Sequence, residues 1–355
     1  MRSITRPGAG IAAAAAAAAL LLVLTGCTSA AQNSGSTGGG KAESASSVKL
    51  ALVPGGAHPY FQPWKEWGTK AKTDFGFGDF TFNETAGWDQ SKQNDVLNSL
   101  VSNGYNAIGI FGVSPTDINS EFKKLKSAGI SVGSLASCPA GDTNDADFCL
   151  STDTQQAAYL AAKAAIAAMG GKGNLVHLTG NAVDSNTQRR EAGVKKAVDE
   201  TNGAVTLLTT VTDIDKDLAT AQKAVSDLLA AHGSEINGIV TTAYNPAVAS
   251  AAGIKAAGLP IKLIAIDDDP TIIAGIKEGS IAGTVVQNPG AQAYVGGWVL
   301  GQLATKACTM KQPGVVVDSG SFVVTKDNAD TYDQQRQDFG KTLKSKFQNE
   351  LLSCK

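Results

Sequence analysis

The sequence predicts an α/β protein with two doubly wound parallel-sheet lobes joined by a multi-strand hinge. Short apolar runs alternate with amphipathic stretches from Val48 onward. Most of these runs are apolar throughout instead of alternating with polar residues, which is typical of parallel strands buried on both faces. The same alternation of strand and helix then starts again in the second half of the chain, which indicates two lobes of one architecture.

The first lobe is predicted from the segments that follow the apolar run "VKLALV". Strands are expected where the runs are short and apolar, and helices where apolar residues recur at helical spacing. Expected strands are 48–53, 80–82, 106–112 and 130–135, and expected helices are 59–75, 89–103 and 115–129.

The second lobe repeats this pattern after residue 153. Segments 106–135 and 237–266 share a strand, a polar loop with proline, a helix, an Ala-Gly pair and a second strand. Expected strands are 174–180, 204–211, 236–242, 262–267 and 281–286, and expected helices are 154–169, 187–200, 215–231, 246–257 and 270–278.

The C-terminal residues are too few for a third domain, and they suggest a chain that crosses between the lobes more than once. A helix over 290–306 precedes the apolar segment 314–325 and a polar helix over 327–351. We expect an N-terminal lobe of residues 48–153 plus 288–320, and a C-terminal lobe of 154–287 plus 321–355.

The N-terminus reads as an export signal followed by a tether. Arg2 and Arg6 precede an apolar run that is short for a membrane span but has the length of a signal-peptide core. The run ends in Leu24-Thr25-Gly26-Cys27, which resembles the lipobox of bacterial lipoproteins and implies cleavage before a lipidated Cys27. An ordinary secretory signal is the alternative. Residues 1–26 are therefore expected to be removed, and residues 27–47 to be the lipidated cysteine and a flexible tether.

Four cysteines remain after Cys27. An even number in an exported chain suggests two disulfides, and three pairings are possible. Pairing Cys138 with Cys149 would close a short polar loop, and pairing Cys308 with Cys354 would hold the C-terminal helix against the body. No spacing is CxxC, so a redox or zinc role is not expected.

Composition and motifs argue against several function classes. A formal net charge of −2 does not favour a nucleic-acid partner. The sequence contains no GxSxG, HExxH, P-loop or strand-linked GxGxxG motif and only three histidines. We therefore expect a protein that is not an enzyme, with no catalytic residues, no cofactor and no metal.

Side chains suited to a small polar ligand gather where the predicted strands end, which is where open α/β sheets bind ligands. Aromatic rings can cover the C–H faces of a sugar, and Asp, Asn, Gln and Arg can pair with its hydroxyls. The stretch "HPYFQPWKEW" after the first strand holds two of the four tryptophans, of which Trp67 is expected to pack in the core. The candidate ligand-binding residues are His58, Tyr60, Phe61, Trp64, Asp89, Gln188, Arg190, Asn245, Asp267 and Gln287.

Together with the lipobox, the ordered motifs "HPYF", "SPTD", "RREAG", "TAYNP", "IAIDDDP" and "VVQNPG" resemble those of the type I periplasmic solute-binding proteins of ABC importers, in the ribose/galactose branch. The similarity covers residues 48–326. It implies a ring-stacking role for Tyr60, Phe61 or Trp64 and hydrogen bonding by the polar candidates. One departure concerns Ala136-Ser137, which stand where sugar-binding relatives often carry an Asp-Arg pair.

The resemblance implies an exported, lipid-anchored monomer on the outer face of the cytoplasmic membrane. Its expected partners are a small neutral sugar or polyol and an ABC transporter permease, with no nucleic acid and with membrane contact only through the lipid anchor. A sensory protein that presents the same ligand to a receptor is the alternative, because it would need the same cleft.

Overall fold

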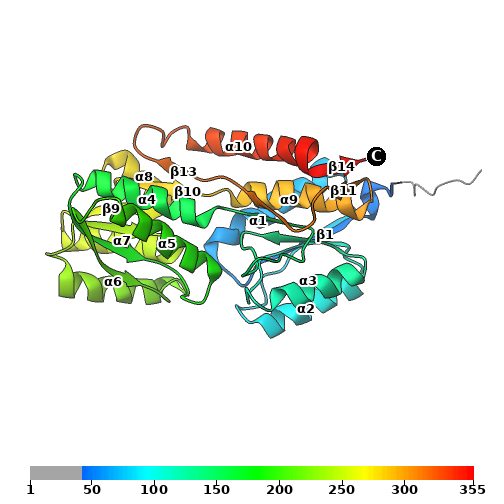
Figure 1. Cartoon of the computed structure of the whole chain (residues 1–355), viewed down its shortest axis with the longest axis horizontal. Coiled ribbons are helices and arrows are strands. Elements are labelled where there is room, and N and C mark those ends of the chain that lie inside the picture. The colour runs from blue at the N-terminus through cyan, green and yellow to red at the C-terminus, as the bar shows by residue number, and fades with distance from the viewer. Residues whose placement is uncertain (1–41) are drawn as a thin grey trace, which may run out of the picture. The chain divides into compact units, whose positions relative to one another are not determined.

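The computed structural model describes residues 42–355. Within them the chain forms two lobes, each built on a six-stranded sheet (Figure 1). The predicted fold class is confirmed, and the signal, Cys27 and most of the tether lie outside the described residues.

Lobe 1 is built on a sheet whose paired strands all run parallel. In spatial order these are β12 (Val315–Asp318), β5 (Phe148–Ser151), β4 (Ser131–Leu135), β3 (Ala107–Ile110), β1 (Lys49–Val53) and β2 (Asp79–Phe82). Its helical segments are η1 (Ala45–Ser47), η2 (Pro59–Phe61), α1 (Gln62–Phe75), α2 (Gln90–Ser102), α3 (Ile118–Ser127) and α9 (Pro289–Ala304).

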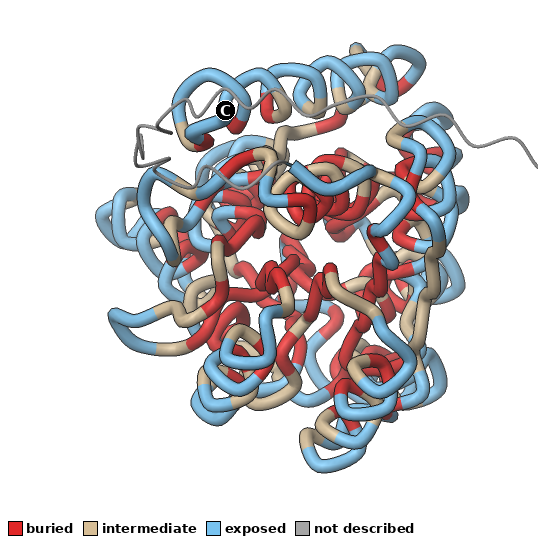
Figure 2. Tube along the Cα trace, turned by 90° about the vertical axis from the view of Figure 1, so that its right-hand side faces the viewer, coloured by how far each residue is buried: buried red, intermediate tan, exposed pale blue. Residues whose placement is uncertain are grey.

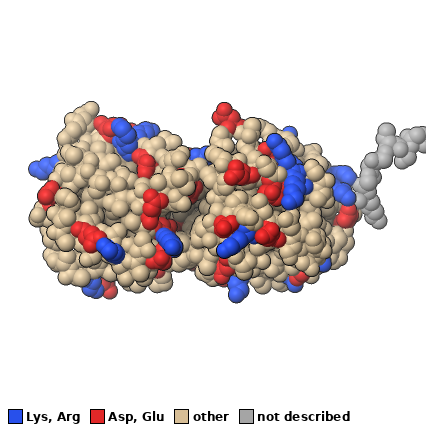
Figure 3. Space-filling model, turned by 90° about the horizontal axis from the view of Figure 1, so that it is seen from below, with Lys and Arg blue, Asp and Glu red and all other residues tan. Residues whose placement is uncertain are grey.

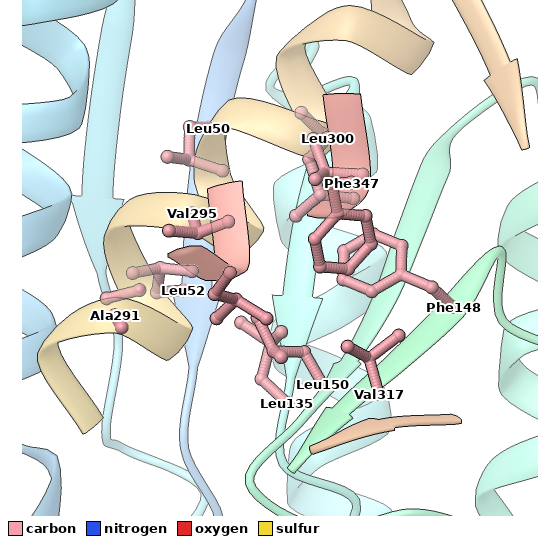
Figure 4. Close-up of a cluster of buried hydrophobic side chains, with 14 of the residues drawn as sticks. Leu50, Leu52, Leu135, Phe148, Leu150, Ala291, Val295, Leu300, Val317 and Phe347 are labelled. Atoms are coloured by element: carbon pink, nitrogen blue, oxygen red, sulfur yellow. The ribbon is translucent and has the colours of Figure 1, made fainter. Parts of the chain in front are cut away.

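Strand β1 explains why the apolar runs of this lobe are continuous. Leu50 and Leu52 pack into one core cluster with α9, whereas Ala51 and Val53 pack into another with α2 and α3. Successive side chains of a strand point to opposite faces, so a strand covered by helices on both faces must be apolar at every position. Figure 4 shows the α9 side of this core, and Figure 2 shows that buried residues fill the interior.

Lobe 2 has a sheet of the same order with one antiparallel edge strand. Its strands are β13 (Phe322–Val324), β10 (Gly283–Val286), β9 (Lys262–Ile266), β8 (Gly238–Thr241), β6 (Gly173–Leu178) and β7 (Val205–Val211). Its helices are α4 (Thr154–Ala168), α5 (Ser185–Asp199), α6 (Leu218–His232), α7 (Tyr244–Ala257) and α8 (Pro270–Glu278).

The C-terminal region differs from the expectation at the chain end. Segment 314–325 contributes β12 to the sheet of lobe 1 and β13 to that of lobe 2, one on each side of the expected lobe boundary between residues 320 and 321. The chain end, expected in the C-terminal lobe, returns to the lobe 1 core through Phe347, whose ring lies 5.5 Å from that of Phe148. The elements there are β11 (Cys308–Met310), α10 (Tyr332–Lys346), the π-helical turn η3 (Phe347–Leu351) and β14 (Leu352–Cys354).

The two disulfides of the described residues join Cys138 to Cys149 and Cys308 to Cys354. The first closes the polar loop before β5, a four-residue strand that the sequence analysis missed because its apolar run is so short. The second joins β11 to β14, which pair antiparallel in a small separate sheet. This is one of the three pairings that the sequence left open.

Candidate functional site

A cavity of about 440 Å³ lies between the two lobes, at the carboxyl ends of their strands. Figure 3 shows the hollow between the lobes from below, with acidic and basic side chains around it. Both lobes line it, as expected when two doubly wound sheets face each other with their carboxyl ends.

Lobe 1 contributes an aromatic wall, formed by His58, Tyr60, Phe61, Trp88 and Phe111. The Phe61 ring lies 5.1 Å from that of Tyr60, 5.3 Å from that of Phe111 and 6.2 Å from that of Trp88. Most of these ring pairs meet edge to face, a favoured geometry for aromatic rings. The rings therefore support one another as a preformed apolar surface.

Trp88 is held in the wall by an uncommon backbone conformation. Its φ of 62° lies in the left-handed region, its N–H donates to the carbonyl of Gly55 at 2.7 Å, and 43% of the residue is exposed. A Cβ on Gly55 or Gly56 would lie 2.8 or 2.7 Å from the indole. The two glycines after β1 are thus required by the close approach of the Trp88 ring.

His58 links the aromatic wall to lobe 2. Its Nδ1 accepts the N–H of Tyr60 at 3.2 Å, so Nε2 carries the proton in the neutral ring. Nε2 lies 3.4 Å from Oδ2 of Asp215, which precedes α6 in lobe 2. Asn245 holds Asp215 from the other side, because its N–H donates to Oδ1 at 2.8 Å and its Nδ2 to the carbonyl at 2.9 Å. These contacts form a bridge across the cleft.

The hydroxyl of Tyr60 is hydrogen-bonded within lobe 1. It donates to Oε1 of Gln292 at 3.0 Å, and Nε2 of Gln292 donates to Oγ of Ser319 at 3.0 Å. Burial, and secondarily the charge of Asp267, raise the pKa of Tyr60. The phenol therefore stays neutral and presents its ring to the cavity.

Asp267 directly follows β9 and is the most buried carboxyl group of the cavity, at 7% exposure. Its Oδ1 accepts from Nε2 of Gln287 at 2.9 Å, and its carbonyl accepts from Oγ1 of Thr284 at 2.7 Å. Burial raises its pKa from the ordinary 3.8 to about 7, against the lowering effect of the Gln287 hydrogen bond. A carboxyl group that is costly to bury and faces a cavity is a strong candidate for ligand contact.

The start of α5 offers polar atoms without partners. Asp184 caps the helix by accepting the N–H of Asn186 at 2.9 Å, and Nδ2 of Asn186 donates to the carbonyl of Ala136 in lobe 1 at 3.3 Å. Among the described residues no hydrogen-bond partner reaches the buried atoms Oδ1 of Asn186 and Nε of Arg190. Buried polar atoms normally have partners, so these are available to a ligand.

Lobe 2 also gives the cavity its charge. Its lining includes four aspartates and two cations, and the aspartates are Asp184, Asp213, Asp215 and Asp267. Arg190 and Lys216 are the cations. The balance is acidic, which disfavours an anionic ligand.

Six of the ten predicted ligand-binding residues line the cavity. They are His58, Tyr60, Phe61, Arg190, Asp267 and Gln287.

The structure places the other four differently. Trp64 is fully buried in the lobe 1 core, with its ring 4.9 Å from that of Phe61. Asp89 is exposed and caps α2 by accepting the N–H of Lys92 at 3.0 Å. Gln188 is exposed beside Lys195 in a separate surface depression, because residues two positions apart, such as Gln188 and Arg190, lie on different sides of a helix. Asn245 does not line the cavity but supports Asp215.

Several lining residues are not among the ten predicted from the sequence. Trp88 stands directly before the expected helix 89–103, and Phe111 stands within the expected strand 106–112. Asp213 and Asp215 follow β7 and Tyr244 follows β8, so position after a strand was the available signal. Position after a strand does not single out these residues, because the loops contain many other polar residues.

Residues 42–355 lack two further features. No group of three or more His, Cys, Asp or Glu side chains in this range could hold a metal ion. In the same range no helix is both long enough and apolar enough to cross a membrane.

The periplasmic binding protein domain model matches residues 51–307. The chain belongs to the periplasmic binding protein family. This confirms the resemblance found in the sequence.

Individual relatives are more distant. The xylitol-binding protein of Mycolicibacterium smegmatis is 24% identical over 243 residues, which cover 68% of this chain and 67% of that protein. An ABC transporter solute-binding protein from Burkholderia graminis, solved with D-arabinose, has a TM-score of 0.71 and 24% identity, over 81% of this chain and 98% of that one. One from Actinobacillus succinogenes, with bound D-allose, has a TM-score of 0.72 and 20% identity, over 80% and 100%. These structures support the fold.

Proposed function

We propose that this periplasmic binding protein captures a small neutral sugar or polyol in the cleft between its lobes and delivers it to the permease of an ABC transporter. The observation that carries the proposal is the contrast between the two walls of the cavity, with aromatic rings on lobe 1 and hydrogen-bonding side chains on lobe 2. Binding, and not bond-making, is the proposed role.

The two walls match the two kinds of surface that a sugar or polyol presents. Rings such as Trp88 and Phe61 can cover C–H faces, and the hydroxyls can pair with Asp267, Asn186 and Arg190. A hydroxyl is both donor and acceptor, so it can satisfy the unpaired Oδ1 of Asn186 and the unpaired Nε of Arg190 alike. An apolar ligand would leave these buried atoms unpaired at a cost of about 1–3 kcal/mol each.

Charge and size narrow the ligand class further. The excess of aspartates over cations in the lining disfavours sugar acids and sugar phosphates. A cavity of about 440 Å³ is at the small end of ligand pockets and suits a monosaccharide-sized solute. The names of the relatives, with xylitol, D-arabinose and D-allose, are consistent with such a ligand.

Closure of the lobes over the ligand supplies the transport signal in this proposal. The ligand contacts both walls at once only when the lobes are closed, so binding favours the closed form. The His58–Asp215 bridge joins the same two lobes and would support that form. The closed monomer would then be recognised by the permease.

The proposed location is the outer face of the cytoplasmic membrane, with Cys27 as the lipid-bearing residue. The motif Leu24-Thr25-Gly26-Cys27 supports this part of the proposal. Replacing Cys27 by Ser should move the protein from the membrane fraction of the expressing cells to the soluble or secreted fraction. Retention of the variant in the membrane fraction would contradict the lipid anchor.

The binding function can be tested by identifying the ligand. Mass spectrometry of small molecules retained by the purified protein should find a neutral hydroxylated solute. Thermal shift with pentoses, hexoses, pentitols and inositols should then show stabilisation, whereas sugar acids and sugar phosphates should give none. Absence of stabilisation by every neutral hydroxylated solute would refute the proposal. Transport assays with and without the permease would separate it from a sensory role.

A further inference from the structure

The C-terminal helix α10 connects the two lobes outside the cleft. It lies beyond residues 51–307, which the family model matches. Tyr332 at its start packs against the lobe 2 core, whereas Leu343 and Phe347 near its end are buried in the lobe 1 core. Figure 1 shows α10, in red, running above α9 along one side of the molecule.

Arg336 is the residue of α10 that reaches toward the site. Its Nη1 donates to Oδ2 of Asp268 at 2.7 Å, and its side chain is only 22% exposed. Its backbone carbonyl accepts from Nδ2 of Asn288 at 3.0 Å. Because the pair is partly shielded from water, it is worth more than an exposed surface ion pair.

Besides Asp333 on the same helix, Arg336 has two partners that are direct neighbours of the hydrogen-bonded pair in the cleft. Asp268 follows Asp267, Asn288 follows Gln287, and Gln287 donates to Asp267 at 2.9 Å. Asp267 also has a φ of 63°, a left-handed conformation that costs a non-glycine residue about 1–2 kcal/mol. A strained residue keeps such a conformation only when its surroundings hold it.

We propose that Arg336 is a positioning residue of the ligand site, which fixes the Asp267–Gln287 pair from outside the cleft by holding Asp268 and Asn288. The effect on affinity rests on the proposed function, whereas the effect on Asp267 itself does not. One turn of α10 thereby contacts both chain segments that carry the pair, the β9–α8 loop and the crossing from β10 to α9.

Electrostatics add a second consequence of the same contact. Burial and, to a smaller extent, the Asp268 carboxylate raise the pKa of Asp267. The Gln287 hydrogen bond and the charges of Arg190 and His58 lower it. Tyr60 and Tyr244 also face Asp267, and Tyr244 donates to Asp269 at 2.7 Å. Arg336 offsets the charge of Asp268, so removing the guanidinium should raise the pKa of Asp267 further.

The test compares three variants of the purified protein. Arg336→Gln removes the charge, and Arg336→Lys keeps the charge but loses the planar fork of donors. Lys341→Gln is the matched control, because Lys341 pairs with Asp338 on the same helix at 2.8 Å but is 72% exposed. Carboxyl ¹³C NMR of the unliganded protein reports the titration of Asp267, and calorimetry with xylitol and D-arabinose as probes reports affinity.

We expect Arg336→Gln to raise the pKa of Asp267 and to weaken binding of whichever probe the wild type binds by at least about tenfold. Arg336→Lys should restore the pKa and part of the affinity, and Lys341→Gln should match the wild type. Unchanged Asp267 titration and unchanged affinity in Arg336→Gln would overturn the inference.

If Arg336→Gln does not fold, Asp268→Asn replaces it, and we expect a lower pKa of Asp267 together with weaker probe binding; no change in either would overturn the inference. If the wild type binds neither probe, the proposed ligand class is in question, and the NMR titration still decides whether Arg336 controls Asp267.

Discussion

The two lobes share a sheet order but differ in what they present to the cleft. Lobe 1 contributes rings, and the lining residue at the end of β4 is Ala136, whose carbonyl accepts from Oγ of Ser151 at 2.9 Å and from Nδ2 of Asn186 at 3.3 Å. Lobe 2 contributes carboxylates, amides and cations. The same architecture has thus produced an aromatic wall and a polar wall.

This difference between the walls fits the absence of an Asp-Arg pair at Ala136-Ser137. The family resemblance implies an Asp-Arg pair at this place, which would let lobe 1 share in hydrogen bonding. Here the Ala136 carbonyl is already paired. We therefore expect lobe 2 to determine which hydroxyl pattern is recognised, and lobe 1 to add affinity by stacking.

The largest effect is expected in lobe 1, and it tests whether Trp64 belongs to the hydrophobic core or to the aromatic wall. Trp64→Ala should lower the free energy of unfolding by about 3–5 kcal/mol, because the ring is fully buried among Phe61 and its neighbours. Urea denaturation measures this. A fully stable Trp64→Ala protein that has lost only ligand binding would instead return Trp64 to the site predicted from sequence.

The next largest effect concerns lobe 2. Asp267→Asn should weaken ligand binding about a hundredfold, because a charge-assisted hydrogen bond is worth about 1.5–3 kcal/mol. Calorimetry with the ligand identified by mass spectrometry measures it. Wild-type affinity in this variant would mean that the polar wall lies elsewhere.

The same substitution should have an opposite effect on stability. The pKa of Asp267 is 3.8 ordinarily and about 7 in the folded protein, so between these values the folded state binds more protons than the unfolded state. The free energy of unfolding of the wild type therefore falls as pH rises from about 4 to about 7, because the folded state increasingly has to bury a charged Asp267. Above about pH 7 this destabilisation is complete. Asp267→Asn should be more stable than wild type at about pH 8, with a smaller advantage at about pH 4. Urea denaturation at both values checks the sign.

A smaller effect on ligand affinity is expected from the aromatic wall of lobe 1. Trp88→Ala should weaken binding about tenfold and change stability little, since the ring is 43% exposed. Trp67 is a matched tryptophan outside the cleft, with its ring 5.8 Å from that of Tyr294. Trp67→Ala should leave affinity unchanged. Equal affinity loss in both variants would mean that fold damage, and not stacking, is being measured.

The smallest effect is expected at Asp89. Asp89→Ala removes the cap of α2 and should cost about 1 kcal/mol of stability without changing affinity. Thermal unfolding and calorimetry on one preparation separate the two. A change in affinity would restore Asp89 to the ligand site.

The sequence predicted the repeated α/β pattern because each buried strand had to be apolar at every position, as Leu50 to Val53 are. It also predicted Asp267 and Gln287, which stand where strands end. It could not separate Trp64 from Trp88, since each is a tryptophan that follows the end of a predicted strand. Only the fold decides that the helical Trp64 faces the sheet while the left-handed backbone of Trp88 turns its ring toward the cleft.

Both ends of the described chain are fastened to lobe 1. The N–H of Glu43 donates to the carbonyl of Thr305 at 2.8 Å, and Cys354 is bonded to Cys308, three residues after Thr305. Whatever precedes residue 42 is therefore attached to the lobe that carries the rings. If the protein is tethered through its N-terminus and its lobes close as proposed, lobe 1 is the lobe held at the tether. Lobe 2, with its polar wall, is then the lobe that moves.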